Sequence, residues 1–194
     1  MNIKILPAYD FQNETAELFT EYTSMLIEND AEFKKYLEIQ KYDDELKDLK
    51  VKYGMPQGRL YIAFSDSSDS AAKHITLGRT AGETTGAAAD DSKAAGCIGL
   101  KRIDDTACEM KRLYVRPEFR GKDIGRILVQ KIIADAKEIG YSYMLLDTLP
   151  FLKSALHIYR EFGFYQIESY NDSPMSTSIY MRLDLSKGFT RSRV

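Results

Sequence analysis

The stretch CEMKRLYVRPEFRGKDIGR, at residues 108–126, decides the fold of this chain. Its β-favouring run at 113–115 predicts a strand, which Pro117 ends because proline cannot donate to a sheet ladder. Apolar residues then recur at helical spacing over 124–139, and Gly140 stands where a left-handed residue commonly ends a helix. The sequence therefore predicts a strand, a short turn and an amphipathic helix in direct succession.

The turn in this stretch has the composition of a phosphate-binding site. Small residues at a helix N-terminus leave backbone N–H groups uncovered, and such a terminus attracts phosphate. Arg120, Lys122 and Arg126 add three cations near the same point. A pyrophosphate would use both the N–H donors and the positive charge. Because any strand, turn and helix can carry a glycine and basic residues, the rest of the chain must support this interpretation.

This unit resembles motif A of the GNAT superfamily of acyl-CoA-dependent N-acetyltransferases, whose signature is Arg/Gln-x-x-Gly-x-Gly/Ala. Arg120 and Gly125 match the ends of the signature, whereas Asp123 stands at its first glycine. The Asp123 carboxylate either turns outward or caps the helix and competes with phosphate for N–H groups. The resemblance implies that acetyl-CoA, as co-substrate, binds here through Arg120, Gly121, Lys122, Asp123, Ile124, Gly125 and Arg126.

A second segment, ALHIYREFGF at 155–164, looks like the Ala-x-x-x-Tyr-x-x-x-Gly-Phe pattern of GNAT motif B. Many relatives carry an asparagine three residues before the alanine, where it contacts the pantetheine arm, but this chain has Leu152 there. The two motifs, in family order, imply one GNAT acetyltransferase domain over residues 1–194. Its expected class is α/β with a mixed sheet, the GNAT-like acyl-CoA N-acyltransferase fold.

The remaining segments fit that architecture. An antiparallel meander should precede a central parallel strand pair, because the crossover from the 109–115 strand to the apolar run at 143–148 is long enough to require parallel pairing. Helices should cover both faces of the sheet. Strands are predicted at 3–6, 59–64, 95–103, 164–170 and 178–185, and helices at 14–28, 30–53 and 152–162. Residues 65–94 have almost no large apolar side chains, which predicts a flexible insertion, and the polar tail 186–194 should fray.

Composition argues against several classes of protein. With a net charge of −2 and a pI near 5.8, the chain lacks the excess of basic residues that is typical of a nucleic-acid-binding protein. Apolar runs too short for a signal peptide or a membrane span favour a cytoplasmic protein that does not contact membranes. Cys97 and Cys108 lack the spacing of a zinc site or a disulfide framework, so we expect no metal. A homodimer is left open.

The resemblance also implies catalytic roles. An amine acceptor must lose a proton before it attacks a thioester, and Glu109 stands where GNAT histone acetyltransferases hold their general base. The alternative is that Glu109 only pairs with a neighbouring cation. Tyr159 occupies the position of the acid that protonates the coenzyme A thiolate, although it could simply pack the helix on the sheet. Backbone groups of the strand segment Leu113, Tyr114 and Val115 should bind pantetheine and the oxyanion, provided that the sheet splays there.

The acceptor is where the sequence is least informative. The resemblance implies that the helical region before the sheet shapes the acceptor side, so Tyr36 and Gln40 are candidate substrate contacts. The alternatives are that Tyr36 packs in the core and that Gln40 faces solvent. Lys111 and Arg112 could hold a carboxylate, which suggests an amino acid or another small acidic amine. We therefore predict acetyl transfer to a small-molecule primary amine by direct attack in a ternary complex. The alternatives are a protein or peptide N-acetyltransferase, or a non-catalytic acyl-CoA-binding module.

Overall fold

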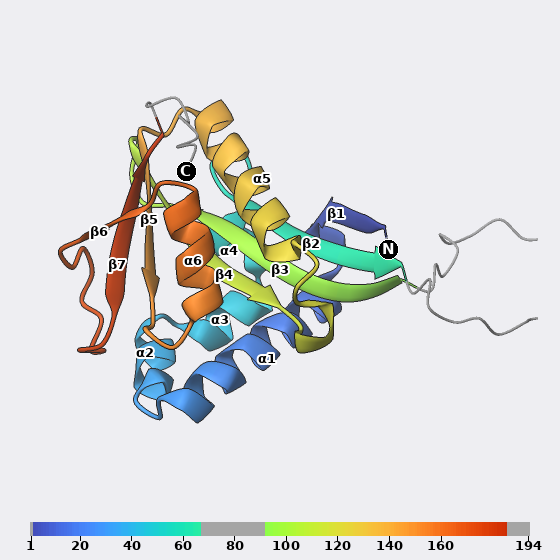
Figure 1. Cartoon of the computed structure of the whole chain (residues 1–194), viewed down its shortest axis with the longest axis horizontal. Helices are drawn as coiled ribbons and strands as arrows, with labels where there is room; N and C mark the ends of the chain where they lie inside the picture. Colours follow the sequence, from blue (N-terminus) through green and yellow to red (C-terminus); the bar gives the residue numbers. More distant parts are fainter. Residues whose placement is uncertain (1, 67–91, 186–194) are drawn as a thin grey trace, which may run out of the picture.

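The computed structural model describes residues 2–66 and 92–185, which form one seven-stranded mixed sheet flanked by helices (Figure 1). The strands lie in the order β1-β2-β3-β4-β5-β7-β6. Their bounds are Ile3–Pro7 for β1, Arg59–Asp66 for β2, Ser92–Arg102 for β3, Ala107–Val115 for β4, Tyr143–Thr148 for β5, Tyr165–Ile167 for β6 and Ile179–Asp184 for β7. The helices are α1 Gln12–Asn29, α2 Phe33–Ile39, α3 Tyr42–Lys47, α4 Leu49–Tyr53, α5 Ile124–Ile139 and α6 Lys153–Glu161.

The predicted topology is confirmed. Strands β1 to β4 form an antiparallel meander, and β5 pairs with β4 in parallel after the α5 crossover. Strand β7 then lies antiparallel between β5 and β6. The strand, turn and helix of the deciding stretch also form as predicted, and Gly140 ends α5 with a φ of 102°.

The alternation of side chains along β2 divides the core into two layers. Leu60, Ile62 and Phe64 pack with α1 and α4 on one face of the sheet. Tyr61 and Ala63 point to the other face, where α5 and α6 cover them. Because neighbouring residues of a strand point to opposite faces, both faces must be apolar, and both are covered.

The single helix predicted over 30–53 is wrong, because the structure has three short helices, α2, α3 and α4, in its place. Lys41 adopts a left-handed conformation with a φ of 54°, and Asp48 is extended. The Asp48 side chain accepts a hydrogen bond from the backbone N–H of Lys50 and so caps α4. Aspartate offers the backbone this local alternative to a continuous helix. The breaks turn Glu45, on α3, into the interior, where it is 4% exposed.

The predicted limits of the insertion also differ from the structure. Strand β2 continues through Asp66 and β3 begins at Ser92, and these two residues pair with each other. Residues 67–91, the greater part of the predicted insertion, lie outside the described residues, as does the tail from 186.

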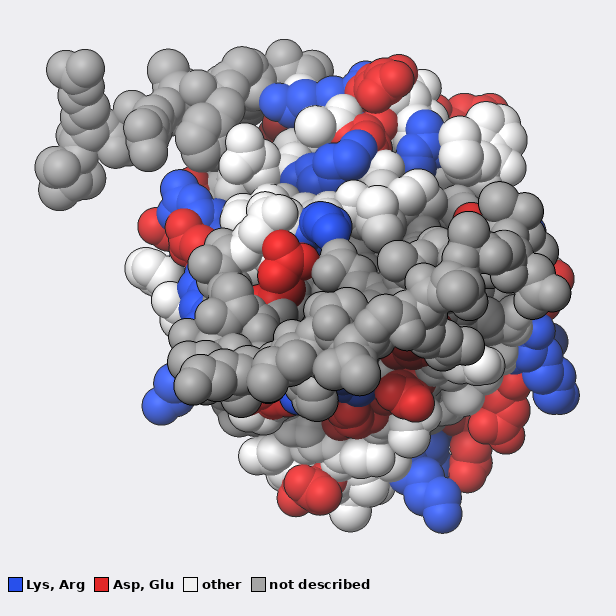
Figure 2. Space-filling model, turned by 90° about the vertical axis from the view of Figure 1, so that its right-hand side faces the viewer, with Lys and Arg blue, Asp and Glu red and all other residues white. Residues whose placement is uncertain are grey.

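Two surface observations complete the fold. On the face shown in Figure 2, acidic and basic side chains are interspersed, and the visible described residues form no broad basic area. Among the helices within 2–66 and 92–185, none combines the length and the apolar character that crossing a bilayer requires.

Candidate active site

The two central strands separate part of the way along their length. β4 and β5 pair only from Ala107 to Glu109 on one strand and from Tyr143 to Leu145 on the other. Beyond these pairs β4 runs on to Val115 and β5 to Thr148 without pairing with each other. The sheet therefore splays at this point. Such a splay is what makes backbone groups of β4 available to a ligand.

A bulge in β4 lies beside the split. β3 pairs Cys97 with Tyr114 and Gly99 with Lys111, so β4 holds one more residue than β3 across this interval. Arg112 takes a φ of 58°, which is uncommon for a residue with a side chain. A bulge re-aims the side chains around it. Lys111 consequently contacts β5, while Arg112 contacts α3.

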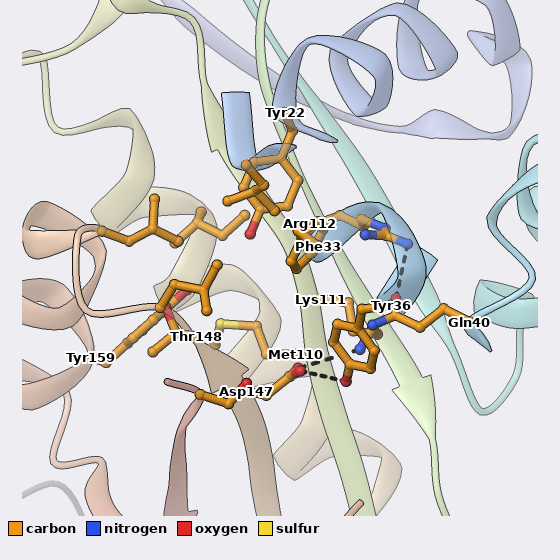
Figure 3. A pocket seen from close by; sticks show the side chains of 15 residues that line it. Tyr22, Phe33, Tyr36, Gln40, Met110, Lys111, Arg112, Asp147, Thr148 and Tyr159 are labelled. Carbon is orange, nitrogen blue, oxygen red and sulfur yellow. Dashed lines mark hydrogen bonds and ion pairs between the residues drawn. The ribbon is translucent and has the colours of Figure 1, made fainter. Parts of the chain in front are cut away.

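A pocket lies at the split, between β4, β5, α1, α2 and α6 (Figure 3). About 530 Å³ of empty space lies in the pocket and at its mouth. All three predicted acceptor contacts line it, as do predicted residues of β4 and α6. The lining includes Tyr36, Gln40, Lys111, Leu113, Asp147 and Tyr159. Glu109, the predicted base, is not among the lining residues.

On one side of the pocket, Lys111 lies between two carboxylates. Its Nζ is 3.2 Å from Glu109 Oε1 and 3.4 Å from Asp147 Oδ1. The Tyr36 hydroxyl donates to Asp147 Oδ2 at 2.7 Å, and the Tyr170 hydroxyl donates to Glu109 Oε1 at 2.8 Å. Glu109 thus makes an ion pair with a neighbouring cation, which was the alternative to its predicted role as a base, and it does not line the pocket.

The charges in this cluster stabilise one another. Burial alone would lower the pKa of Lys111, but the nearby carboxylates Asp147 and Glu109 outweigh burial and raise that pKa. Burial would raise the pKa of Asp147, but the Lys111 charge and the Tyr36 hydrogen bond outweigh it and lower that pKa. Asp147 is therefore an ionised carboxylate that faces the pocket at neutral pH.

On the other side, Arg112 is held by Glu45. The guanidinium donates from Nε to Glu45 Oε1 at 2.8 Å and from Nη2 to Oε2 at 2.9 Å. Nη2 also donates to Gln40 Oε1 at 3.3 Å, and Lys52 Nζ lies 2.5 Å from Glu45 Oε2. Burial would raise the pKa of Glu45, but the Arg112 hydrogen bond and charge prevail and lower it to about 2.

Tyr159 reaches the pocket from α6, on the side opposite Gln40 in Figure 3. The residue is 6% exposed, and its ring packs against Phe164 with 5.7 Å between centroids. Burial raises the pKa of the Tyr159 hydroxyl, so the group is a protonated phenol at neutral pH. A protonated hydroxyl is the form that a proton donor needs.

The predicted phosphate turn lies between the end of β4 and the start of α5. Gly121 and Asp123 have φ values of 74° and 62°, which explains why a glycine is typical at the position of Asp123. The Asp123 side chain makes no capping hydrogen bond and is exposed, so the outward orientation is the correct alternative. In the described part of the chain, the backbone N–H groups of residues 121–126 donate no hydrogen bond to a protein acceptor.

The three cations of the turn differ in their contacts. Arg120 Nε donates to the Val115 carbonyl at 3.1 Å, and Lys122 lies over the Phe119 ring. Arg126 donates to Glu161 Oε2 at 2.8 Å and so joins α5 to α6. Arg120 and Lys122 are exposed, whereas Arg126 is partly committed to an ion pair.

Sequence reasoning missed two residues of the site. Asp147 is the one acid in the apolar strand β5, and an acid in a strand covered on both faces is a signal of a polar site. Glu45 gave no such signal, because it lies among many charges that resemble a solvated helix face. Within the described residues, no group of three histidine, cysteine or acidic side chains is placed to hold a metal.

Comparison with known proteins is consistent with this geometry. The family model for the acetyltransferase (GNAT) family matches residues 42–164. An uncharacterized N-acetyltransferase of Schizosaccharomyces pombe is 38% identical over 157 residues, which cover 80% of this chain and 82% of that protein. A GNAT family acetyltransferase structure from Staphylococcus aureus has a TM-score of 0.65 at 19% identity, covering 95% of this chain and 99% of that one. The PaiA N-acetyltransferase of Thermoplasma acidophilum, solved in complex with coenzyme A, has a TM-score of 0.62 at 18% identity, with 95% and 99% covered.

Proposed function

Because the chain belongs to the GNAT family of acetyltransferases, we propose that it transfers the acetyl group of acetyl-CoA to the primary amine of a small molecule, by direct attack in a ternary complex. The observation that carries the proposal is the pocket at the split between β4 and β5, with Asp147 facing it from one strand and Tyr159 from α6.

The donor would bind along the turn and the strand edge. The uncovered N–H groups of residues 121–126, with Arg120 and Lys122, suit the diphosphate of coenzyme A. Coenzyme A is also the ligand in the Thermoplasma acidophilum structure of the same fold. From the turn, the pantetheine arm would follow the edge of β4 that β5 leaves unpaired, through Val115, Tyr114 and Leu113. The thioester would then reach the pocket.

The reaction needs one proton acceptor and one proton donor. The amine nitrogen attacks the thioester carbonyl, a C–N bond forms, and the C–S bond breaks as the tetrahedral intermediate collapses. Backbone N–H groups near Leu113 are proposed to stabilise the oxyanion. The nitrogen loses its proton to the enzyme, and the coenzyme A thiolate takes a proton from the Tyr159 hydroxyl.

We assign proton removal to the cluster of Glu109, Lys111 and Asp147. Asp147 lines the pocket, whereas Glu109, the predicted base, does not line it, contacts Lys111 and accepts a hydrogen bond from Tyr170. Both carboxylates contact Lys111, so we assign the base function to the pair until each is tested separately.

The shape of the pocket favours a small acceptor over a protein lysine. Helix α2 closes the acceptor side, because Tyr36 is hydrogen-bonded to Asp147 and Gln40 to Arg112. An extended peptide chain would need an open groove at this side. The matching test is an acetyl-CoA-dependent thiol-release screen over small amines, amino acids and peptides. Turnover of peptides alone would favour the protein acetyltransferase, and tight coenzyme A binding without thiol release from any amine would favour a non-catalytic binding module.

A further inference from the structure

We infer that the acceptor carries a carboxylate beside its amine, and that Arg112 and Gln40 bind this carboxylate. The acceptor would thus be a small amino acid or a compound of that type. The inference rests on the proposed function, because it concerns the same pocket, but it adds a recognition site for a second group of the acceptor.

Two clusters of opposite formal charge flank the pocket. Glu109, Lys111 and Asp147 form the negative cluster, with a formal charge of −1. Glu45, Lys52 and Arg112 form the positive cluster, with a formal charge of +1. Lys101 also approaches Glu109, at 3.6 Å, but its side chain is 39% exposed, so solvent screens it from the pocket. Figure 3 shows the carboxylate of Asp147 and the guanidinium of Arg112 at separate positions around the pocket.

Arg112 has donors to spare. A guanidinium carries five N–H donors, and Nε and Nη2 of Arg112 account for the contacts with Glu45 and Gln40. The structure shows no acceptor for Nη1 among the described residues, although the side chain is only 3% exposed. The rings of Phe19 and Tyr42 flank the guanidinium at 5.6 Å and 5.2 Å, which leaves its edge for a ligand. Because Arg112 lines the pocket, Nη1 is available to an acceptor group of a ligand there.

Gln40 adds a second donor. Its Oε1 accepts from Arg112 Nη2, so the two N–H donors of the amide lie on Nε2. One of them can serve the hydrogen bond that Gln40 makes with Tyr36, which leaves the other for a ligand in the pocket that Gln40 lines. A carboxylate is planar and accepts two parallel hydrogen bonds, so Arg112 Nη1 and Gln40 Nε2 together match its chemistry.

The opposite cluster suits the other end of such an acceptor. Asp147 faces the pocket as an ionised carboxylate and can pair with the ammonium group before deprotonation. A diamine would bring its second cation to Arg112, which is unfavourable. A simple alkylamine would offer Arg112 no acceptor for its remaining N–H donors. The pair of clusters therefore favours a zwitterion over either alternative.

The test compares three acceptors that differ in one group: alanine, alaninamide and ethylamine. With wild-type protein and acetyl-CoA, we expect kcat/KM for alanine to exceed that for alaninamide by at least about tenfold. Gln40→Glu places a negative charge at the proposed carboxylate site. It should lower kcat/KM for alanine, mainly through KM, by about tenfold more than it lowers kcat/KM for alaninamide. Gln130→Glu, at an exposed position of α5, is the matched control for the added charge.

The outcomes separate this inference from the proposed function. Acetylation of alaninamide or ethylamine as fast as alanine would overturn the inference and leave the enzyme class intact. If no acceptor releases thiol, binding is measured instead, by thermal shift of the coenzyme A-loaded protein. Stabilisation by alanine and not by alaninamide would support the carboxylate site while contradicting catalysis. Equal stabilisation by both, or by neither, would overturn the inference.

Discussion

The Tyr36 hydroxyl donates a 2.7 Å hydrogen bond to Asp147 Oδ2, and this bond ties helix α2 to the end of strand β5. Asn171 Nδ2 donates to the same hydroxyl at 3.3 Å, so a third segment joins the contact. Three segments that are distant in the sequence thus meet at the Tyr36 hydroxyl. The bond from Tyr36 joins two residues that line the pocket and helps to keep Asp147 ionised.

Tyr36→Phe should therefore weaken acceptor binding. Loss of a hydrogen bond to a charged group should raise the KM of the acceptor by about tenfold, with the KM of acetyl-CoA unchanged. Steady-state kinetics with each substrate varied in turn measures both constants. The matched control is Tyr9→Phe, which removes a hydroxyl that donates to the Tyr53 carbonyl away from the pocket. Equal effects of the two variants would show that Tyr36 acts only on stability.

Tyr159→Phe should lower kcat by about 100-fold and leave both KM values near those of the wild type, because only the proton donor to the thiolate is removed. The ring contact with Phe164 remains, so the midpoint of thermal unfolding should hardly change. Tyr165→Phe, at a residue that is 45% exposed, is the control. Full turnover by Tyr159→Phe would assign the proton to another donor.

Substitutions in the negative cluster should separate binding from proton removal. Asp147→Asn should lower kcat and also raise the acceptor KM, because Asp147 lines the pocket. Glu109→Gln should lower kcat by about 100-fold without changing the acceptor KM, because Glu109 does not line the pocket. Measuring kcat and the acceptor KM of both variants as a function of pH tests these expectations. If Glu109→Gln keeps full activity, the base predicted from the sequence is wrong and Asp147 takes the role.

Asp123→Gly should strengthen acetyl-CoA binding. Glycine adopts the φ of 62° without strain, and the change removes a carboxylate close to the proposed diphosphate site. We expect the KM of acetyl-CoA to fall by about threefold or more, by the same electrostatic reasoning. Asp123→Asn keeps the shape, tolerates the left-handed conformation and removes only the charge. An increase in KM for both variants would mean that the carboxylate supports the turn instead of opposing the ligand.

Stability should fall in acid through Glu45. The pKa of this carboxyl is about 2 in the folded protein, below its ordinary value of 4.5. A lowered pKa stabilises the folded state above the unfolded pKa, and this contribution is lost as the pH falls from about 5 toward 2. Glu45→Gln should lower the free energy of unfolding by roughly 3–5 kcal/mol at pH 7, because it leaves Arg112 buried without its partner. Urea unfolding of both proteins at several pH values should show that the difference in the free energy of unfolding between wild type and Glu45→Gln becomes smaller toward pH 2.

The neighbour Asp44 provides the control for this experiment. Asp44 pairs with Lys47 at the surface, where its side chain is 68% exposed. Asp44→Asn should leave the midpoint of urea unfolding nearly unchanged at any pH, because an exposed ion pair contributes little to stability. A difference between wild type and Glu45→Gln that stays constant from pH 7 to pH 2 would contradict the account of Glu45.

The central β4 to α5 unit was predictable because its signals are local. Alternation to Val115, the stop at Pro117 and the left-handed Gly140 depend on residues close in the sequence, and all three hold in the structure. The breaks in the 30–53 region depend instead on Asp48 competing for the backbone and on Glu45 finding Arg112, 67 positions away. Periodicity along the chain carries no information about such a distant partner.

The contacts within the pocket also depend on partners that are distant in the sequence. The lining by Tyr36 and Gln40 was predicted through the family resemblance, but the link from Tyr36 to Asp147 spans 111 positions. The bulge that turns Lys111 toward β5 and Arg112 toward α3 is set by the register between β3 and β4, which the sequence of β4 alone does not specify.

The most direct measurement is a crystal structure of the protein with coenzyme A. We predict that the diphosphate lies within hydrogen-bond distance of the backbone nitrogens of residues 121–126. We also predict that the pantetheine arm follows the unpaired edge of β4 and that the thiol ends in the pocket beside Tyr159. A diphosphate bound elsewhere, or a thiol that points away from the split between β4 and β5, would contradict these predictions.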